Sequence, residues 1–296
     1  MSARQENILT ALARTLDAPV DEPATRALSV GTFSRCMRYE TARGPVFVKH
    51  GPASAEAMFT AEAAGLIALA QAQAVRVPGV LASGTCADGA FLALEWIDLG
   101  NATRASEALL GEQLAWQHRS TQRQFGWDRD NTIGSTPQPN AWCARWIEFL
   151  RERRLRWQLG LAARNGAAAH TIERGQRLCE LLDAFFSSYD PAPSLLHGDL
   201  WGGNWGTDAD GAPVIFDPAV YYGDREADIA MTRLFGGFGH AFYTAYQSTW
   251  PLDPAAGTRS TLYNLYHVLN HYNLFGGDYG SKAGAMIDRL LAELGH

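Results

Sequence analysis

The residues best suited to do chemistry lie in one stretch, His197-Gly-Asp-Leu-Trp-Gly-Gly-Asn204, and in Asp217 further along the chain. Asp199 can accept a proton from an attacking hydroxyl group. Asn204 and Asp217 offer oxygen atoms to Mg²⁺, which prefers hard oxygen ligands and retains several waters. An acid, an amide and a second acid after an apolar run are typical of metal-assisted phosphoryl transfer. The pattern therefore predicts Asp199 as the catalytic base and Asn204 and Asp217 as metal ligands.

Lys49 is the next residue with a chemical signature, because the 25 basic residues include only one other lysine, Lys282. It ends a β-branched and aromatic run that predicts a strand. A compact ammonium and a guanidinium are not equivalent against phosphate in a confined site. Glu62 follows on the apolar face of a predicted Ala-rich helix, where an unpaired charge would be costly. We expect Glu62 to pair with Lys49 and Lys49 to contact phosphate.

The elements that must position these residues change character near residue 100. The first part predicts a helix at 3–16, five strands and one further helix that carries Glu62. The strands are expected near 27–30, 33–40, 45–50, 77–84 and 91–97. Helical patterns then dominate, at 105–120, 141–163, 169–187, 225–233, 239–247, 258–273 and 282–294. We predict an α+β, bilobal fold with a β-rich lobe at 1–97, a larger helical lobe at 98–296 and the active site in the cleft.

Composition excludes several classes of protein. The 296 residues are 47% hydrophobic, which is enough for a sizeable core, and the formal charge of -6 argues against nucleic acid as the main partner. Four cysteines without CxxC spacing predict neither a disulfide framework nor a zinc site. The polar start and the absence of a long apolar run predict neither a signal peptide nor a membrane segment. We expect a cytoplasmic protein and leave the oligomeric state open.

Together these residues resemble the protein-kinase-like superfamily, and within it the fructosamine kinase (ketosamine-3-kinase) family. The shared features are a strand lysine, a helix glutamate, a hinge after a strand, an Asp-x-x-x-x-Asn loop and a metal-binding aspartate. The resemblance spans about residues 28–293 and is carried by Gly44-Pro-Val-Phe-Val-Lys49, Met58-Phe-Thr-Ala-Glu62, Leu110-Gly-Glu-Gln-Leu-Ala-Trp-Gln-His118, Phe125-Gly-Trp with Asn131-Thr-Ile-Gly134, Leu195-Leu-His-Gly-Asp-Leu-Trp-Gly-Gly-Asn204, Asp217-Pro-Ala-Val-Tyr-Tyr-Gly223 and Leu269-Asn-His-Tyr-Asn-Leu-Phe275.

The resemblance implies phosphorylation of the 3-hydroxyl of ketosamines, which are sugar–amine adducts, by ATP and Mg²⁺. The adduct could be free or protein-bound, and loss of the sugar after phosphorylation would make the reaction a deglycation. Lys49 would contact the ATP phosphates, and the backbone of Glu95, Trp96 and Ile97 would hydrogen-bond adenine. Gly31 would form the nucleotide loop, although family members usually have more glycines there.

The acceptor side of the site rests on an indole and a histidine. Trp201 lies inside the catalytic stretch, and an indole face suits the C–H face of a sugar. His267 and His271 have the i, i+4 spacing of metal ligands, but no HExxH motif or third ligand accompanies them. We therefore expect core or acceptor-site packing, with His271 beside the substrate. His197 is expected to bond the loop backbone, and Asp228 to accept from N–H groups of the catalytic loop.

Three alternatives fit parts of the pattern. Another small-molecule kinase of the superfamily, acting on an aminoglycoside or choline, would use the same ATP-handling residues. A kinase-like nucleotide-binding module without catalysis would not need the right residue type at every catalytic position. A metallophosphatase could use Gly-Asp and His, but the chain has no Asp-x-His and its eight histidines are dispersed.

Overall fold

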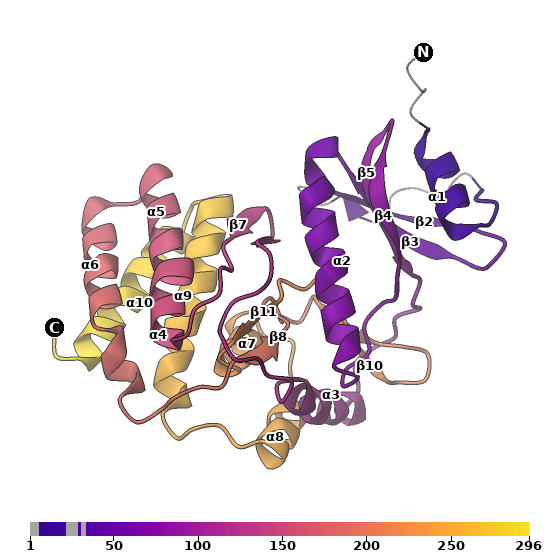
Figure 1. Cartoon of the computed structure of the whole chain (residues 1–296). Coiled ribbons are helices and arrows are strands. Elements are labelled where there is room, and N and C mark those ends of the chain that lie inside the picture. Colours follow the sequence, from indigo (N-terminus) through magenta and orange to yellow (C-terminus); the bar gives the residue numbers. More distant parts are fainter. Residues whose placement is uncertain (1–5, 22–28, 31–33) are drawn as a thin grey trace. The chain divides into compact units, whose positions relative to one another are not determined.

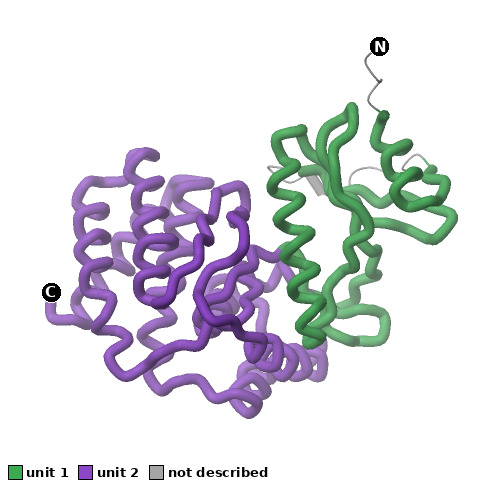
Figure 2. Tube along the Cα trace, in the orientation of Figure 1, with its two compact units in different colours: residues 1–102, 206–217 green, residues 103–205, 218–296 purple. Residues whose placement is uncertain are grey.

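The structure, a computed structural model, describes residues 6–21, 29–30 and 34–296. The chain divides into two compact units (Figure 2). The first comprises Met1–Ala102 and Gly206–Asp217, and the second Thr103–Trp205 and Pro218–His296. This division differs from the predicted boundary after residue 97. The 206–217 segment belongs to the first unit because its backbone bonds with residues there: Gly100 N donates to Thr207 O, and Ile215 N donates to Arg76 O.

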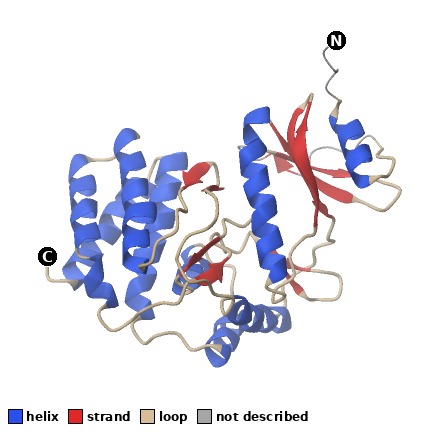
Figure 3. Cartoon of the chain, viewed as in Figure 1, coloured by secondary structure: helices blue, strands red, loops and turns tan. Residues whose placement is uncertain are grey.

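A five-stranded antiparallel sheet forms the framework of the first unit (Figure 3). Its strand order is β1-β2-β3-β5-β4, with β1 (Ser29–Val30), β2 (Arg35–Tyr39), β3 (Val46–Gly51), β4 (Val80–Cys86) and β5 (Gly89–Glu95). The first six residues of β5 are buried. Burial of successive residues, which point to opposite faces, indicates cover on both faces of the sheet.

Two helices cover this sheet from opposite sides (Figure 1). Helix α1 (Ile8–Leu16) buries Ala11 and Leu12 in a cluster with strand residues that include Val48 and Phe91. Helix α2 (Glu56–Gln71) packs against β4 and β5 and buries Phe59, Leu66 and Leu69. By length and composition alone, one helical stretch of the described residues is apolar enough to cross a membrane: Ala53–Gln71, which comprises α2 and the short 3-10 helix Ala53–Ala55 before it.

The second unit is mainly helical. Its helices are α3 (Arg104–Gln117), α4 (Trp146–Phe149), α5 (Arg156–Arg164), α6 (Ala169–Glu180), α7 (Glu226–Leu234), α8 (His240–Thr249), α9 (Ala256–Phe275) and α10 (Tyr279–Glu293). The predicted helix at 141–163 was wrong at its start and in its regularity. Cys143 pairs with Phe125 in extended conformation, so the helix begins at Trp146, and a π-helical segment, Leu150–Leu155, separates α4 from α5.

Short strand pairs position the loops of the site. β8 (Ser194–Leu196) pairs with β11 (Tyr221–Gly223), and the predicted catalytic loop, His197–Asn204, begins directly after β8. β6 (Asn131–Ile133) pairs with β7 (Thr136–Gln138), which the sequence did not predict because three residues are too few for an alternating pattern. β9 (Trp205–Thr207) and β10 (Pro213–Ile215) form a hairpin that leads to Asp217.

Candidate active site

Lys49 is the centre of an ion-pair network in the first unit. Its Nζ lies 2.7 Å from Glu62 Oε1 and 2.7 Å from Asp217 Oδ1. β3 supplies Lys49, α2 supplies Glu62, and the segment after β10 supplies Asp217. The structure thus contains the pair that the sequence predicted, and it adds the second carboxylate to the same ammonium.

Burial and charge act in opposite directions on this network. Burial alone would lower the pKa of Lys49, but the carboxylates of Glu62 and Asp217 raise it, so the ammonium stays charged. Burial raises the pKa of Glu62, and the Lys49 ammonium opposes that shift. Asp217 has a left-handed backbone with φ of 58°, which an aspartate tolerates better than most residues. Strain of this kind is commonly retained where function requires it.

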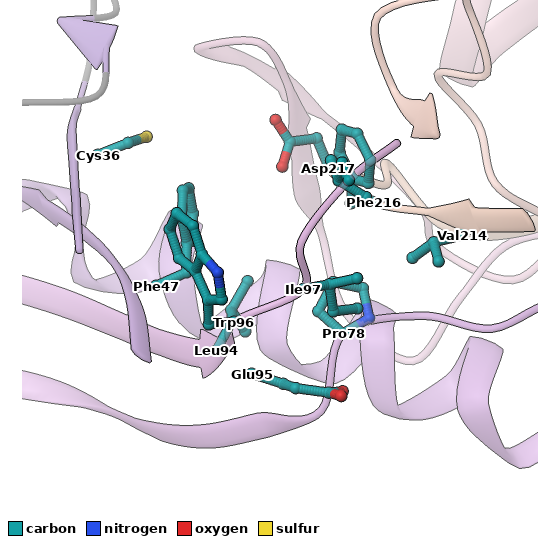
Figure 4. A pocket seen from close by; sticks show the side chains of 11 residues that line it. Cys36, Phe47, Pro78, Leu94, Glu95, Trp96, Ile97, Val214, Phe216 and Asp217 are labelled. Atoms are coloured by element: carbon teal, nitrogen blue, oxygen red, sulfur yellow. The ribbon is translucent and has the colours of Figure 1, made fainter. Parts of the chain in front are cut away.

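An apolar pocket of about 340 Å³ lies beside this network, lined entirely by residues of the first unit (Figure 4). Phe47 and Trp96 lie on one side of it, and Val214 and Phe216 on the other. Its lining includes Cys36, Pro78, Leu94, Glu95, Ile97, Leu99 and Asp217. The three residues whose backbone is expected to hydrogen-bond adenine, Glu95, Trp96 and Ile97, therefore border an apolar pocket that Asp217 also lines.

Arg76, which sequence reasoning missed, bonds with residues of two elements, the end of β5 and the β9–β10 hairpin. Its Nη2 lies 2.7 Å from Glu95 Oε1, and its Nη1 donates to Asp208 Oδ2. Its carbonyl also accepts from Ile215 N. Asp208 in turn closes the hairpin turn by accepting from Asp210 N. Arg76 thereby connects the end of β5 to the hairpin that carries the chain to Asp217.

The catalytic loop of the second unit is held by its own backbone and side chains. Asn204 Nδ2 donates to Asp199 O at 2.8 Å, and Asp199 N donates to His197 Nδ1 at 3.3 Å. Gly198 has φ of 82°, and a Cβ there would lie 2.1 Å from Ala219 O. Only glycine fits this turn, which brings the loop against the segment after Asp217. His197 thus bonds the loop backbone, as the sequence analysis expected.

Asp228 holds the loop through hydrogen bonds to its backbone N–H groups. Its carboxylate accepts from His197 N at 2.7 Å, from Gly198 N at 2.9 Å and from His118 Nε2 at 3.1 Å. Burial alone would raise the pKa of Asp228, but these donors lower it and keep the carboxylate charged. Burial lowers the pKa of His118, so its neutral ring accepts from the Tyr246 hydroxyl through Nδ1. The role expected for Asp228 is present, and His118 is an additional support.

The 131–140 segment holds the chain that follows Asp217. Asn131 Nδ2 donates to Val220 O at 2.8 Å, and Gln138 Nε2 donates to Ala219 O at 3.2 Å. Both side chains are buried. Asn140, also buried, donates to Asn131 Oδ1 and so completes a network of amides. The amides of this segment thus position the backbone next to the catalytic loop.

The two residues expected on the acceptor side lie in the second unit. Trp201 is 40% exposed. His271 is half-buried on α9, and Phe235 lies between the two, with ring centroids 6.4 Å from Trp201 and 4.8 Å from His271. His267 is buried, and burial lowers its pKa to about 3, so it is neutral.

Gly31 lies outside the described residues. Cys36 is half-buried and borders the apolar pocket, and all four cysteines are unpaired thiols. The described residues hold no group of three or more His, Cys, Asp or Glu placed to bind a metal. The predicted ligands are instead one carboxylate, Asp217, and one amide, Asn204. The Asn204 amide nitrogen bonds Asp199 O. A hard cation takes oxygen ligands, so the amide oxygen of Asn204 is the atom expected to bind it.

These features define a protein-kinase-like phosphotransferase fold. An aminoglycoside phosphotransferase solved with ADP and hygromycin B shares it with a TM-score of 0.63 over 96% of this chain and 98% of that chain, at 14% identity. Identity this low speaks for the fold alone.

The chain belongs to the fructosamine kinase family, whose profile matches residues 4–293. It is 41% identical over 287 residues to a protein of Synechocystis assigned as a ketoamine kinase, covering 97% of this chain and 96% of that one. It is 42% identical over 267 residues to the chloroplastic protein-ribulosamine 3-kinase of Arabidopsis thaliana, covering 89% and 81%. A crystal structure from Haemophilus somnus, assigned as a fructosamine-3-kinase, has a TM-score of 0.88 at 30% identity and 96% coverage of both chains.

Proposed function

We propose that this protein is an ATP-dependent kinase that phosphorylates the 3-hydroxyl of ketosamines. The proposal rests mainly on the loop that carries Asp199, because the Asp228 carboxylate accepts hydrogen bonds from the two residues before Asp199 and so holds the loop in place. The chain that contains this loop matches the fructosamine kinase family across nearly all its length. The names of the relatives supply the substrate class, and the protein-ribulosamine 3-kinase name supplies the position of the hydroxyl.

The nucleotide would be bound by groups of the first unit. Adenine would occupy the apolar pocket, with the backbone of Glu95, Trp96 and Ile97 as its polar partners. Lys49 would contact the phosphates, since its ammonium is kept charged and is held in place by Glu62. Retention of charge matters because phosphoryl transfer depends mainly on positioning and charge neutralisation.

Asp199 would accept the proton of the sugar hydroxyl as the hydroxyl oxygen attacks the γ-phosphorus of ATP. The bond from that oxygen to the γ-phosphorus forms while the bond from the γ-phosphorus to the oxygen of ADP breaks. Asn204 and Asp217 offer the amide and carboxylate oxygens that suit Mg²⁺, which when bound neutralises charge on the phosphates. Trp201 and His271 would form the acceptor side, with the indole against the sugar.

The experiment that tests this function is ATP consumption with a panel of ketosamines and aminoglycosides, with and without Mg²⁺. We expect turnover with ketosamines only, dependent on Mg²⁺, and a product phosphorylated at O3. Turnover of aminoglycosides in preference to ketosamines would refute the proposed substrate class. ATP binding without turnover of any acceptor would instead support a non-catalytic nucleotide-binding module.

A further inference from the structure

A run of aromatic rings leads away from the catalytic loop across the second unit. We call it the aromatic strip, and its members are Trp201, Phe235, His271, Phe275 and Tyr279. Three of these side chains are substantially exposed: Trp201 by 40%, Phe235 by 39% and Phe275 by 59%. Grouped exposed aromatic rings on a soluble protein commonly mark a binding surface.

The rings of the strip contact one another in sequence. Trp201 lies 6.4 Å from Phe235, and Phe235 lies 4.8 Å from His271, between ring centroids. His271 then lies 5.7 Å from Phe275 and 5.1 Å from Tyr279. These spacings are those of packed aromatic pairs, so the strip is continuous. It begins two residues after Asp199 and ends at the start of α10.

Glycines build the start of the strip into the catalytic loop. A Cβ on Gly202 would lie 2.8 Å from the Cα of Gly237, and a Cβ on Gly203 would lie 2.3 Å from the Trp201 ring. The backbone that follows Phe235 therefore packs directly against the loop, and the Trp205 indole nitrogen donates to Gly237 O at 3.2 Å. Phe235 is thus fixed to the same loop that carries the proposed base.

His271, in the middle of the strip, is uncharged, and its Nε2 can accept a hydrogen bond. His271 Nδ1 bonds the His267 carbonyl at 2.8 Å, and since a carbonyl only accepts, Nδ1 carries the hydrogen. Nε2 therefore keeps its lone pair. Burial lowers the pKa of His271, so the ring is uncharged at neutral pH. Lys282, at the far end, lies 5.8 Å from the Tyr279 ring centroid and makes that end positive.

We propose that the aromatic strip binds the hydrocarbon arm of the substrate's amine, so that the enzyme selects ketosamines by the length of the amine substituent. This inference rests on the proposed function, because it requires a ketosamine at Asp199. The secondary ammonium of the adduct would lie at the Trp201 end, where aromatic faces attract cations. The positive charge of Lys282 disfavours the binding of a cation at the Tyr279 end of the strip.

The occupant follows from the chemistry of the strip. An alkyl chain lying over Phe235 and Phe275 removes apolar surface of both partners from water, and the benefit grows with each methylene. A sugar presents hydroxyl groups around its ring and would gain less from a row of unsubstituted phenyl rings. The sugar is therefore assigned to Trp201 at the loop, and the amine arm to the rings beyond it.

The test compares ketosamines of one sugar with methylamine, butylamine and hexylamine, each assayed for kcat/KM with saturating ATP. For the wild type we expect a hexylamine-to-methylamine ratio of about tenfold, equivalent to about 1.4 kcal/mol. Phe275→Ala and Phe235→Ala should each reduce this ratio several-fold. A merely structural defect would instead lower kcat/KM for all three adducts equally and leave the ratio intact.

Trp116→Ala is the matched control, since Trp116 is 53% exposed on α3 and stacks on Arg119, outside the strip. It should leave the ratio at the wild-type value. A wild-type ratio near one, or a ratio that neither Phe variant changes, would overturn the inference while the kinase assignment stands. Failure of the wild type to phosphorylate any of the three adducts would overturn the proposed function and this inference with it.

Discussion

Replacing Asp228 with asparagine tests how the catalytic loop is held. The carboxylate is 1% exposed and accepts from His197 N and His118 Nε2 through Oδ2, and from Gly198 N through Oδ1. Asparagine has nearly the same shape, but one of its two terminal atoms donates. Whichever way the amide turns, its NH₂ group faces at least one N–H donor, and the other bonds lose the assistance of a charge.

The magnitude follows from these contacts. A hydrogen bond to a charged group contributes about 1.5–3 kcal/mol, a neutral one about 0.5–1.5, and a buried donor left unsatisfied costs about 1–3. Asparagine also relieves the burial of a charge, which offsets part of the loss. The pKa of Asp228 is nevertheless lowered, so in the folded protein its donors outweigh that burial cost. We expect Asp228→Asn to reduce the free energy of unfolding by about 3 kcal/mol.

Urea unfolding and steady-state kinetics on the same preparations measure this effect. Asp183→Asn is the control, because Asp183 is an acid with a 56% exposed side chain paired with Arg145 and Arg151, and such pairs contribute about 0–1 kcal/mol. Asp228→Asn should also lower kcat, since it frees the backbone next to Asp199, with less effect on the KM for ATP. A stability loss no larger than that of the control, with unchanged kcat, would refute the reasoning.

Three further changes test other parts of the site. Lys49→Arg should lower kcat/KM for ATP by at least about tenfold despite the conserved charge. The Lys49 ammonium lies 2.7 Å from both the Glu62 and the Asp217 carboxylates, and the larger guanidinium does not fit between them. Wild-type kinetics would contradict this. Arg76→Met should raise the KM for ATP about fivefold with little change in kcat, since loss of its partially exposed pairs with Glu95 and Asp208 costs about 1 kcal/mol; a selective loss of kcat would speak against it. Asp224 directly follows β11 and is buried. This burial, and then the Glu226 carboxylate, raises the pKa of Asp224 to about 7, so the folded state retains a proton that the unfolded state has lost. Stability should therefore fall by up to about 1.4 kcal/mol per pH unit as the pH rises towards 7, a slope that Asp224→Asn should remove in urea unfolding at several pH values.

The residues expected to carry out the chemistry were easier to predict from the sequence than the residues that hold them in place. Lys49 and Glu62 could be paired because an apolar helix face does not hold an isolated carboxylate. The loop from His197 to Asn204 is local, so its spacing is visible directly. His118 and Arg76 gave no such signal, since their partners Asp228 and Asp208 lie more than a hundred residues away and are joined only by the fold.

Some predictions were wrong or incomplete because contacts between segments distant in the sequence decide the local structure. Residues 141–145 have a helical composition, yet Cys143 exchanges backbone hydrogen bonds with Phe125, and this tertiary pairing overrides propensity. The sequence predicts that residues 205–215 belong to the helical lobe, because they lie among helices along the chain, whereas their backbone bonds join them to Arg76 and Gly100. The aromatic strip was only partly visible, since contact of Phe235 with His271 depends on how α7 and α9 pack.

The most direct test of the central claim is transfer of the γ-phosphate of ATP to a ketosamine by the wild type and by Asp199→Asn. Phosphorus NMR and mass spectrometry of the product would locate the phosphate. The account predicts O3-phosphorylated ketosamine from the wild type and a kcat lower by about 100-fold or more in Asp199→Asn, with little change in either KM. Wild-type turnover by Asp199→Asn, or no phosphorylated ketosamine from the wild type, would contradict it.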